Sequence, residues 1–328
     1  MSAFRKGWHK EIYMRVSFFR FGKQIQVFSL FLLFVAHLPI AAFSESATKE
    51  WDLKESWVLS PKQAYLLKQK GAVLLDARDL SLRYLPKVAD TKTISWEELS
   101  VKSSPNNGKL LSDQEILGKL SKVGIGSDTT VIVIGDPLNG WGEEGRIVWT
   151  LRTVGIKKSF WIDGGAKAYT RYLSQVGNGN SETNKGLEIK QDKNAKKKEL
   201  DIDHSQLKSA LNAPNKKIFV LDVREEREFK GETPYGESRG GHIPGAKWLY
   251  FKSFLNQEGY LKSKEEILSV LTKESIPKNG IVVSYCTGGI RSAWTTSVLI
   301  SYGIEAKNYS GSMWEWSSLD SKEYPLVK

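Results

Sequence analysis

Cys286 is the only cysteine in this 328-residue chain, and its sequence surroundings could make it a nucleophile. The apolar run Ile281–Tyr285 predicts a buried strand, and a helix is expected from about Ser292. A cysteine between a strand and a helix faces free backbone N–H groups and the positive end of the helix dipole. Both stabilise a thiolate, which is the form of cysteine that attacks electrophiles. A buried structural cysteine is the alternative interpretation.

The segment after the cysteine predicts a loop that surrounds the sulfur. Its glycines allow the backbone to curl, and Arg291 adds a fixed positive charge at the rim. Backbone N–H groups of this loop could bind an anionic sulfur or substrate. The candidate residues for this role are Thr287, Gly288, Gly289, Ile290 and Ser292.

Loop length separates two kinds of cysteine chemistry. Cysteine phosphatases hold phosphate in a Cys-x5-Arg loop, whereas this chain has Cys286-x4-Arg291. The smaller ring suits a persulfide sulfur better than a tetrahedral phosphate. A cysteine phosphatase or an arsenate reductase therefore remains an alternative that the loop length disfavours.

Charge and composition limit the classes of partner. The net charge is +11, and residues 1–44 contribute +5 of it through six Lys/Arg and one acidic residue. The remaining positive charge favours small anionic substrates. The sequence has no long basic face with interleaved aromatic residues, so we do not expect nucleic-acid binding. A single cysteine and four histidines without ligand spacing predict no metal site, and we expect no cofactor.

Residues 1–44 have the features of an export signal. A basic stretch precedes the apolar run Val27–Leu38, which has the length of a signal-peptide core and is short for a membrane span. Small residues predict cleavage after Ser44, and an uncleaved anchor is the alternative. Either Met1 or Met14 is the start. We expect a periplasmic or secreted protein that contacts the membrane only if this segment is retained.

Two similar α/β units follow the signal segment. Strands alternate with helices across residues 50–177, which indicates a parallel sheet. Residues 178–199 are rich in Gly, Asn, Ser and Lys and predict a linker. Residues 200–328 repeat the first unit, with Leu74–Arg78 matching Val220–Arg224. The predicted fold class is α/β, with two tandem domains that are each a parallel sheet flanked by helices.

The repeat also compares the two halves at the cysteine. Matching Val131–Ile134 with Ile281–Ser284 places Asp136 opposite Cys286. The first unit therefore lacks the nucleophile, and we expect it to be catalytically silent. Its expected role is to pack on the second unit and form one wall of the site.

Several motifs in order resemble the rhodanese-type sulfurtransferases. They are Asp222-Val-Arg224, Gly241–Ala246, the Cys286 loop and Tyr309–Ser312, within a resemblance that covers roughly residues 55–320. Thiosulfate and 3-mercaptopyruvate sulfurtransferases also have two tandem halves, of which only the second is active. The resemblance implies transfer of a sulfane sulfur from a small anionic donor to a thiophilic acceptor through a Cys286 persulfide. Thiosulfate is the favoured donor, 3-mercaptopyruvate is the other candidate, and cyanide or a thiol is the acceptor.

The sequence also departs from those enzymes. The loop Cys286-Thr-Gly-Gly fits neither enzyme type, and a substrate-binding arginine of the thiosulfate enzymes falls at Glu228, where the charge is reversed. Arg291, helped by Arg227 or Arg239, is then the candidate to bind the substrate anion. These departures leave open an exported, non-enzymatic module that carries or senses persulfide.

Three further side chains have weaker signals. Trp314 or Trp316 could line the pocket or belong to the core. The resemblance implies a structural role for His242, which holds the Pro244-Gly245 turn, and a Cys–His pair is the alternative.

Overall fold

The computed structural model describes residues 49–84, 86–177, 199–213, 218–276 and 280–328. The predicted signal segment lies outside these residues, as does the predicted linker except for Glu199. Among the described residues, no helix has the length and apolar character needed to cross a membrane.

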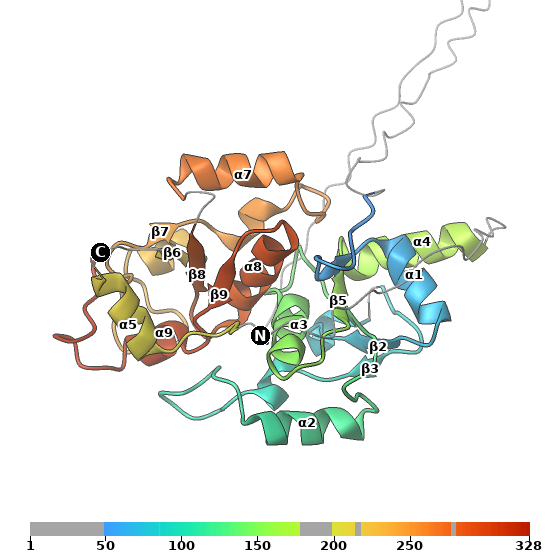
Figure 1. The fold of residues 1–328 in the computed structure, drawn as a ribbon, viewed down its shortest axis with the longest axis horizontal. Coiled ribbons are helices and arrows are strands. Elements are labelled where there is room, and N and C mark those ends of the chain that lie inside the picture. The colour runs from blue at the N-terminus through green and yellow to red at the C-terminus, as the bar shows by residue number, and fades with distance from the viewer. Residues whose placement is uncertain (1–48, 85, 178–198, 214–217, 277–279) are drawn as a thin grey trace, which may run out of the picture. The chain divides into compact units, whose positions relative to one another are not determined.

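The N-terminal half (residues 49–177) is built on a parallel five-stranded sheet in the order β1-β5-β4-β2-β3 (Figure 1). Apart from the exposed edge strand Lys92–Thr93, its strands are short and mostly Val, Ile, Leu and aromatic residues, which suit a sheet buried on both faces. Its strands and helices are β1 Val58–Leu59, α1 Pro61–Gln69, β2 Val73–Asp76, β3 Lys92–Thr93, α2 Asp113–Lys122, β4 Val131–Ile134, α3 Glu143–Thr153, β5 Ser159–Ile162 and α4 Gly165–Gly177.

The C-terminal half (residues 199–328) is built on a parallel four-stranded sheet in the order β7-β6-β8-β9. Its strands and helices are α5 His204–Asn212, β6 Ile218–Asp222, α6 Glu226–Phe229, β7 Lys247–Trp248, α7 Lys264–Lys273, β8 Ile281–Tyr285, α8 Ile290–Ser301, β9 Ala306–Asn308 and α9 Ser312–Trp316. The predicted fold class of two parallel sheets flanked by helices is confirmed.

The two sheets share one strand order, because β5-β4-β2-β3 corresponds to β9-β8-β6-β7. Helix starts are also repeated. Ser112 begins α2 and Ser263 begins α7, each with a reciprocal hydrogen bond to a glutamate three residues later. The internal repeat that the sequence predicts is therefore a repeat of structure.

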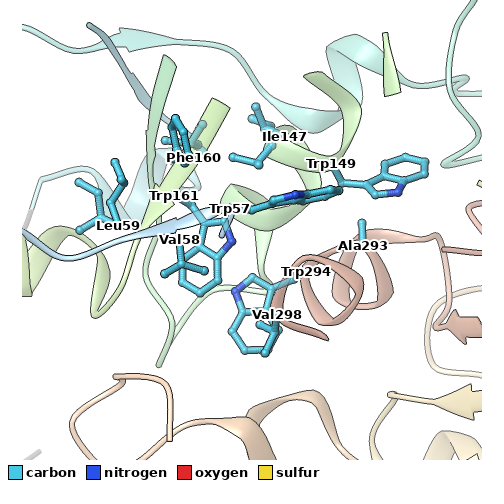
Figure 2. Close-up of a cluster of buried hydrophobic side chains, with 14 of the residues drawn as sticks. Trp57, Val58, Leu59, Ile147, Trp149, Phe160, Trp161, Ala293, Trp294 and Val298 are labelled. Carbon is cyan, nitrogen blue, oxygen red and sulfur yellow. The ribbon is translucent and has the colours of Figure 1, made fainter. Parts of the chain in front are cut away.

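Helices α3 and α8 pack against each other and join the two halves (Figure 1). Figure 2 shows the apolar cluster at this contact, with Trp149 and Ile147 from α3 and Trp294, Ala293 and Val298 from α8. Gly145 allows the close approach, because a Cβ there would lie 2.6 Å from the Trp294 Cα. The apolar core therefore continues from one half into the other.

Candidate active site

Cys286 directly follows β8, at the carboxyl end of the second sheet. Helix α8 begins four residues later, and Gly289 is its N-cap with a φ of +81°. This left-handed conformation favours glycine, and a Cβ at Gly289 would lie 2.5 Å from the Ser310 carbonyl oxygen. The chain therefore turns tightly enough to direct backbone N–H groups back at the sulfur.

The Cys286 sulfur accepts hydrogen bonds from its own loop. The Gly289 N–H donates at 3.1 Å and the Ser292 hydroxyl lies 3.6 Å away. Burial by itself raises the pKa of this thiol, since only 1 % of the residue is exposed. The charge of Arg291 and hydrogen bonds from Ser292 and Gly288 act in the opposite direction and leave the pKa below its ordinary value. The site therefore favours a thiolate.

Helix α9 holds the other side of the loop. The Cys286 N–H donates to the Ser312 hydroxyl at 3.0 Å, and the Trp314 N–H donates to the Thr287 carbonyl at 2.9 Å. The Trp314 ring covers Gly288 so closely that a Cβ at this glycine would lie 2.1 Å from it. Of the two tryptophans considered from the sequence, Trp314 therefore borders the loop, whereas Trp316 is buried in the core.

The Arg291 guanidinium lies within the site, but it is paired with a carboxylate. It donates to both oxygens of Glu228, at 2.7 and 2.8 Å, and to the Thr287 hydroxyl at 2.7 Å. The Thr287 hydroxyl in turn donates to Glu228 at 2.7 Å. Burial raises the pKa of Glu228, yet the bonds from Arg291 outweigh it and keep this pKa below the ordinary range. Glu228 is thus a charged partner that compensates much of the arginine's charge.

Aromatic rings from both halves lie over this ion pair. The Arg291 guanidinium is 5.0 Å from the Trp141 ring centroid and 5.7 Å from that of Tyr235. The two rings contact each other edge to face at 5.4 Å. Trp141 is 39 % exposed, so the outer wall of the site includes a residue of the N-terminal half.

The other two arginines proposed for the substrate anion lie in different surroundings. Arg227 is about half exposed and pairs with Glu225 at 2.7 Å. Arg239 donates to four backbone carbonyls near the end of the chain, those of Trp316, Ser317, Leu319 and Tyr324. These hydrogen bonds hold the C-terminal segment in place and occupy the Arg239 guanidinium. Among the predicted loop residues, in contrast, Gly288, Gly289 and Ser292 contribute hydrogen bonds to the sulfur, whereas the Thr287 hydroxyl bonds Glu228 and Arg291.

Arg146, on α3 of the N-terminal half, is a site residue that the sequence did not reveal. Its guanidinium donates to the Gly289 carbonyl at 2.9 Å, to the Ser100 hydroxyl at 3.0 Å and to the Gly108 carbonyl. Gly108 also lies against the loop, because a Cβ there would be 2.2 Å from the Gly288 carbonyl oxygen. No motif marks these residues, and only a contact between the halves brings them to the cysteine.

The equivalent position in the N-terminal half is Gly135, and the alignment of Asp136 with Cys286 is wrong by one residue. Asp76 pairs with Ile134 in the first sheet, and Asp222 pairs with Tyr285 in the second. Glu144 fills the place of the missing side chain, because a Cβ at Gly135 would lie 2.0 Å from its carboxylate. Burial raises the pKa of Glu144 to about 8. In the N-terminal half, the space that corresponds to the Cys286 side chain is therefore occupied by the carboxyl group of Glu144.

His242 makes structural contacts. Its Nδ1 lies 3.0 Å from the Phe229 carbonyl, and its ring stacks on the Phe229 ring at a centroid distance of 3.7 Å. Nearby, Asp222 and Arg224 form a fully buried ion pair at 2.6 Å. These residues support the framework behind the loop.

Comparison with known proteins agrees with this architecture. Residues 203–319 match the sequence model of the rhodanese-like domain. The sulfur carrier protein TtuD of Thermus thermophilus is 27% identical over 78% of this chain and 91% of its own. A thiosulfate sulfurtransferase of Corynebacterium glutamicum is 27% identical over 86% of this chain and 92% of its own. The crystal structure of YnjE has a TM-score of 0.64 at 24% identity, covering 83% of this chain and 68% of that one.

Residues 203–319 are thus a rhodanese-like domain, and over most of its length the chain is similar to thiosulfate and 3-mercaptopyruvate sulfurtransferases. These relatives include both a sulfur carrier protein and thiosulfate sulfurtransferases.

Proposed function

We propose that the chain catalyses sulfane sulfur transfer through a persulfide on Cys286. The observation that carries this proposal is the hydrogen bonding of the Cys286 sulfur. N–H and O–H donors surround it, and the pKa of its thiol is lowered despite burial. The same donors suit the anionic terminal sulfur of a persulfide.

The reaction takes two displacement steps. The Cys286 thiolate attacks the outer sulfur of thiosulfate, the S–S bond breaks, and sulfite leaves with the bonding electron pair. An acceptor such as cyanide then attacks the terminal sulfur of the persulfide. The Cys286 thiolate leaves with its electron pair and thiocyanate is released, so no oxidant or reductant is needed.

We propose thiosulfate as the first donor and 3-mercaptopyruvate as the second. The Arg291 charge attracts either anion, but Glu228 compensates much of it. We therefore expect weak binding of a dianion and a high KM for thiosulfate. Arg227 and Arg239 remain proposed contributors at longer range, through their charge alone.

A sulfur carrier is the second candidate function. TtuD, one of the relatives, is named a sulfur carrier protein. Cys286 is almost completely buried, which favours transfer of its sulfur to a particular partner protein over transfer to any small acceptor. In that case the persulfide forms on Cys286, but small acceptors discharge it slowly.

We further propose that residues 1–44 direct export of the chain, to the periplasm or beyond. A fusion of these residues to a reporter active only outside the cytoplasm tests this. Reporter activity that is equal with and without residues 1–44 would refute it.

The test of function is initial rates of thiocyanate formation from thiosulfate and cyanide, with Cys286→Ser as the matched control. We expect ping-pong kinetics and loss of turnover in Cys286→Ser. Turnover retained by Cys286→Ser would refute the proposal. Activity with 3-mercaptopyruvate alone would change the donor, and a stable persulfide without turnover would favour the carrier.

A further inference from the structure

We propose that Arg146, from the half that lacks the nucleophile, is a positioning residue that supplies counter-charge to the anionic sulfur of Cys286. The catalytic significance of this role rests on the proposed sulfur transfer. The evidence for the role is the geometry of the contact between the halves. It assigns the N-terminal half a part in the chemistry beyond forming a wall.

The first step in the argument is the position of Arg146. Its Nη1 donates to the Gly289 carbonyl at 2.9 Å, while the N–H of the same Gly289 donates to the Cys286 sulfur at 3.1 Å. The Asn308 amide donates to that carbonyl from the other side, at 3.3 Å. Holding the carbonyl fixes the orientation of the residue whose N–H binds the sulfur.

The second step is that Arg146 is a buried cation held by uncharged groups. It is 0 % exposed, and its three hydrogen-bond partners are two carbonyls and a hydroxyl. Its Nε has no hydrogen-bond partner among the described residues. Burial lowers its pKa to about 10, and the two anionic groups that oppose this effect are Asp201 and Cys286. A buried charge without a directly bonded carboxylate is stabilised by any anion nearby.

Asp201 is the competing counter-charge. Its carboxylate accepts bonds from the Ser310 hydroxyl at 2.7 Å and from the Ser310 and Ile202 N–H groups. Burial raises the pKa of Asp201 to about 6, so its charge is lost more readily than that of an ordinary aspartate. On the other side of the sulfur, Arg291 is compensated by Glu228. Above about pH 6 Asp201 is ionised, so the Asp201 carboxylate, which has the larger effect, and the Cys286 sulfur share the charge of Arg146.

Helix α3 offers a matched control in Arg152. Arg152 is partly buried, and burial lowers its pKa to about 9. Its guanidinium donates to the Ser159 carbonyl and lies over Trp57, within the N-terminal half. Removing either arginine deletes a cation of α3, but only Arg146 touches the cysteine loop.

The experiment measures the pKa of Cys286 from its thiolate absorbance in the full chain, Arg146→Gln, Arg146→Lys and Arg152→Gln. The chain has one cysteine, so subtracting Cys286→Ser isolates the signal. In Arg146→Gln we expect the pKa of Cys286 to rise by about one unit, with about tenfold less thiolate below it. In Arg146→Lys we expect a smaller rise, because the charge stays but the planar donor pair is lost.

A folded Arg146→Gln chain with an unchanged Cys286 pKa would overturn the inference, as would an equal rise in Arg152→Gln. If Arg146→Gln does not fold, the neutral variant Arg146→Met replaces it under the same criterion, and a folded chain with an unchanged Cys286 pKa refutes the inference. Because thiolate titration needs no turnover, these outcomes are independent of whether sulfur transfer itself is found.

Discussion

Replacing Glu228 by glutamine should make thiosulfate bind better. The carboxylate of Glu228 bonds both terminal nitrogens of Arg291, and the pair is buried beside the sulfur. Glutamine keeps the shape and one acceptor but removes the negative charge. The positive charge of Arg291 then becomes available to an anionic donor.

The size of this effect follows from the strength of a charge-assisted hydrogen bond. Such a bond contributes about 1.5–3 kcal/mol, so the KM for thiosulfate should fall roughly 10- to 100-fold. Breaking a buried ion pair also destabilises the fold, by about 3–5 kcal/mol. The variant should therefore melt earlier while binding its donor more tightly, which separates the two effects.

The assay measures initial rates against thiosulfate concentration at fixed cyanide, at low and at high salt. Glu237→Gln is the matched control, because Glu237 is also buried and lies 3.4 Å from the Thr287 hydroxyl, yet its other oxygen accepts from the Tyr235 N–H. We expect a much smaller change in KM for this control. An unchanged or higher KM in folded Glu228→Gln would refute the reasoning about Arg291.

Three further predictions concern packing and titration. Gly145→Ala places a Cβ 2.6 Å from the Trp294 Cα, so urea unfolding should show a loss of about 1–3 kcal/mol, and no loss would contradict the tight contact between halves. Burial raises the pKa of Glu144 to about 8, so the stability it contributes is present below its unfolded pKa near 4.5 and is lost as the pH rises through about 8. Relative to the unchanged chain, Glu144→Gln should therefore gain stability progressively from about pH 4.5 to about pH 8 and level off above it, and parallel stability curves would exclude this. Ser292→Ala removes the hydroxyl 3.6 Å from the sulfur and should raise the pKa of Cys286, which thiolate titration checks; an unchanged pKa would exclude that contribution.

The sequence predicts the central strand and its nucleophile well, for local reasons. Ile281–Tyr285 is an apolar run that ends at the only cysteine, and the observed β8 has these bounds. Glycines after it mark a tight turn, which the +81° φ of Gly289 requires. The repeat of two α/β halves could also be predicted, because similar segments recur at similar spacing.

Contacts that join distant residues could not be predicted in this way. Glu228 and Arg291 are separated by 63 positions, and nothing local indicates that they pair. Arg146 reaches Gly289 across 143 positions and across the boundary between the halves. The alignment of Asp136 with Cys286 was wrong because loops of unequal length leave the register undetermined until strand pairing fixes it.

The most direct test of the account is the intact mass of the chain after incubation with thiosulfate. We predict one added sulfur atom per chain, located on Cys286, absent from Cys286→Ser and removed by cyanide as thiocyanate. Sulfur transfer at full rate without this adduct, or an equal adduct on Cys286→Ser, would contradict the claim that Cys286 carries the sulfur.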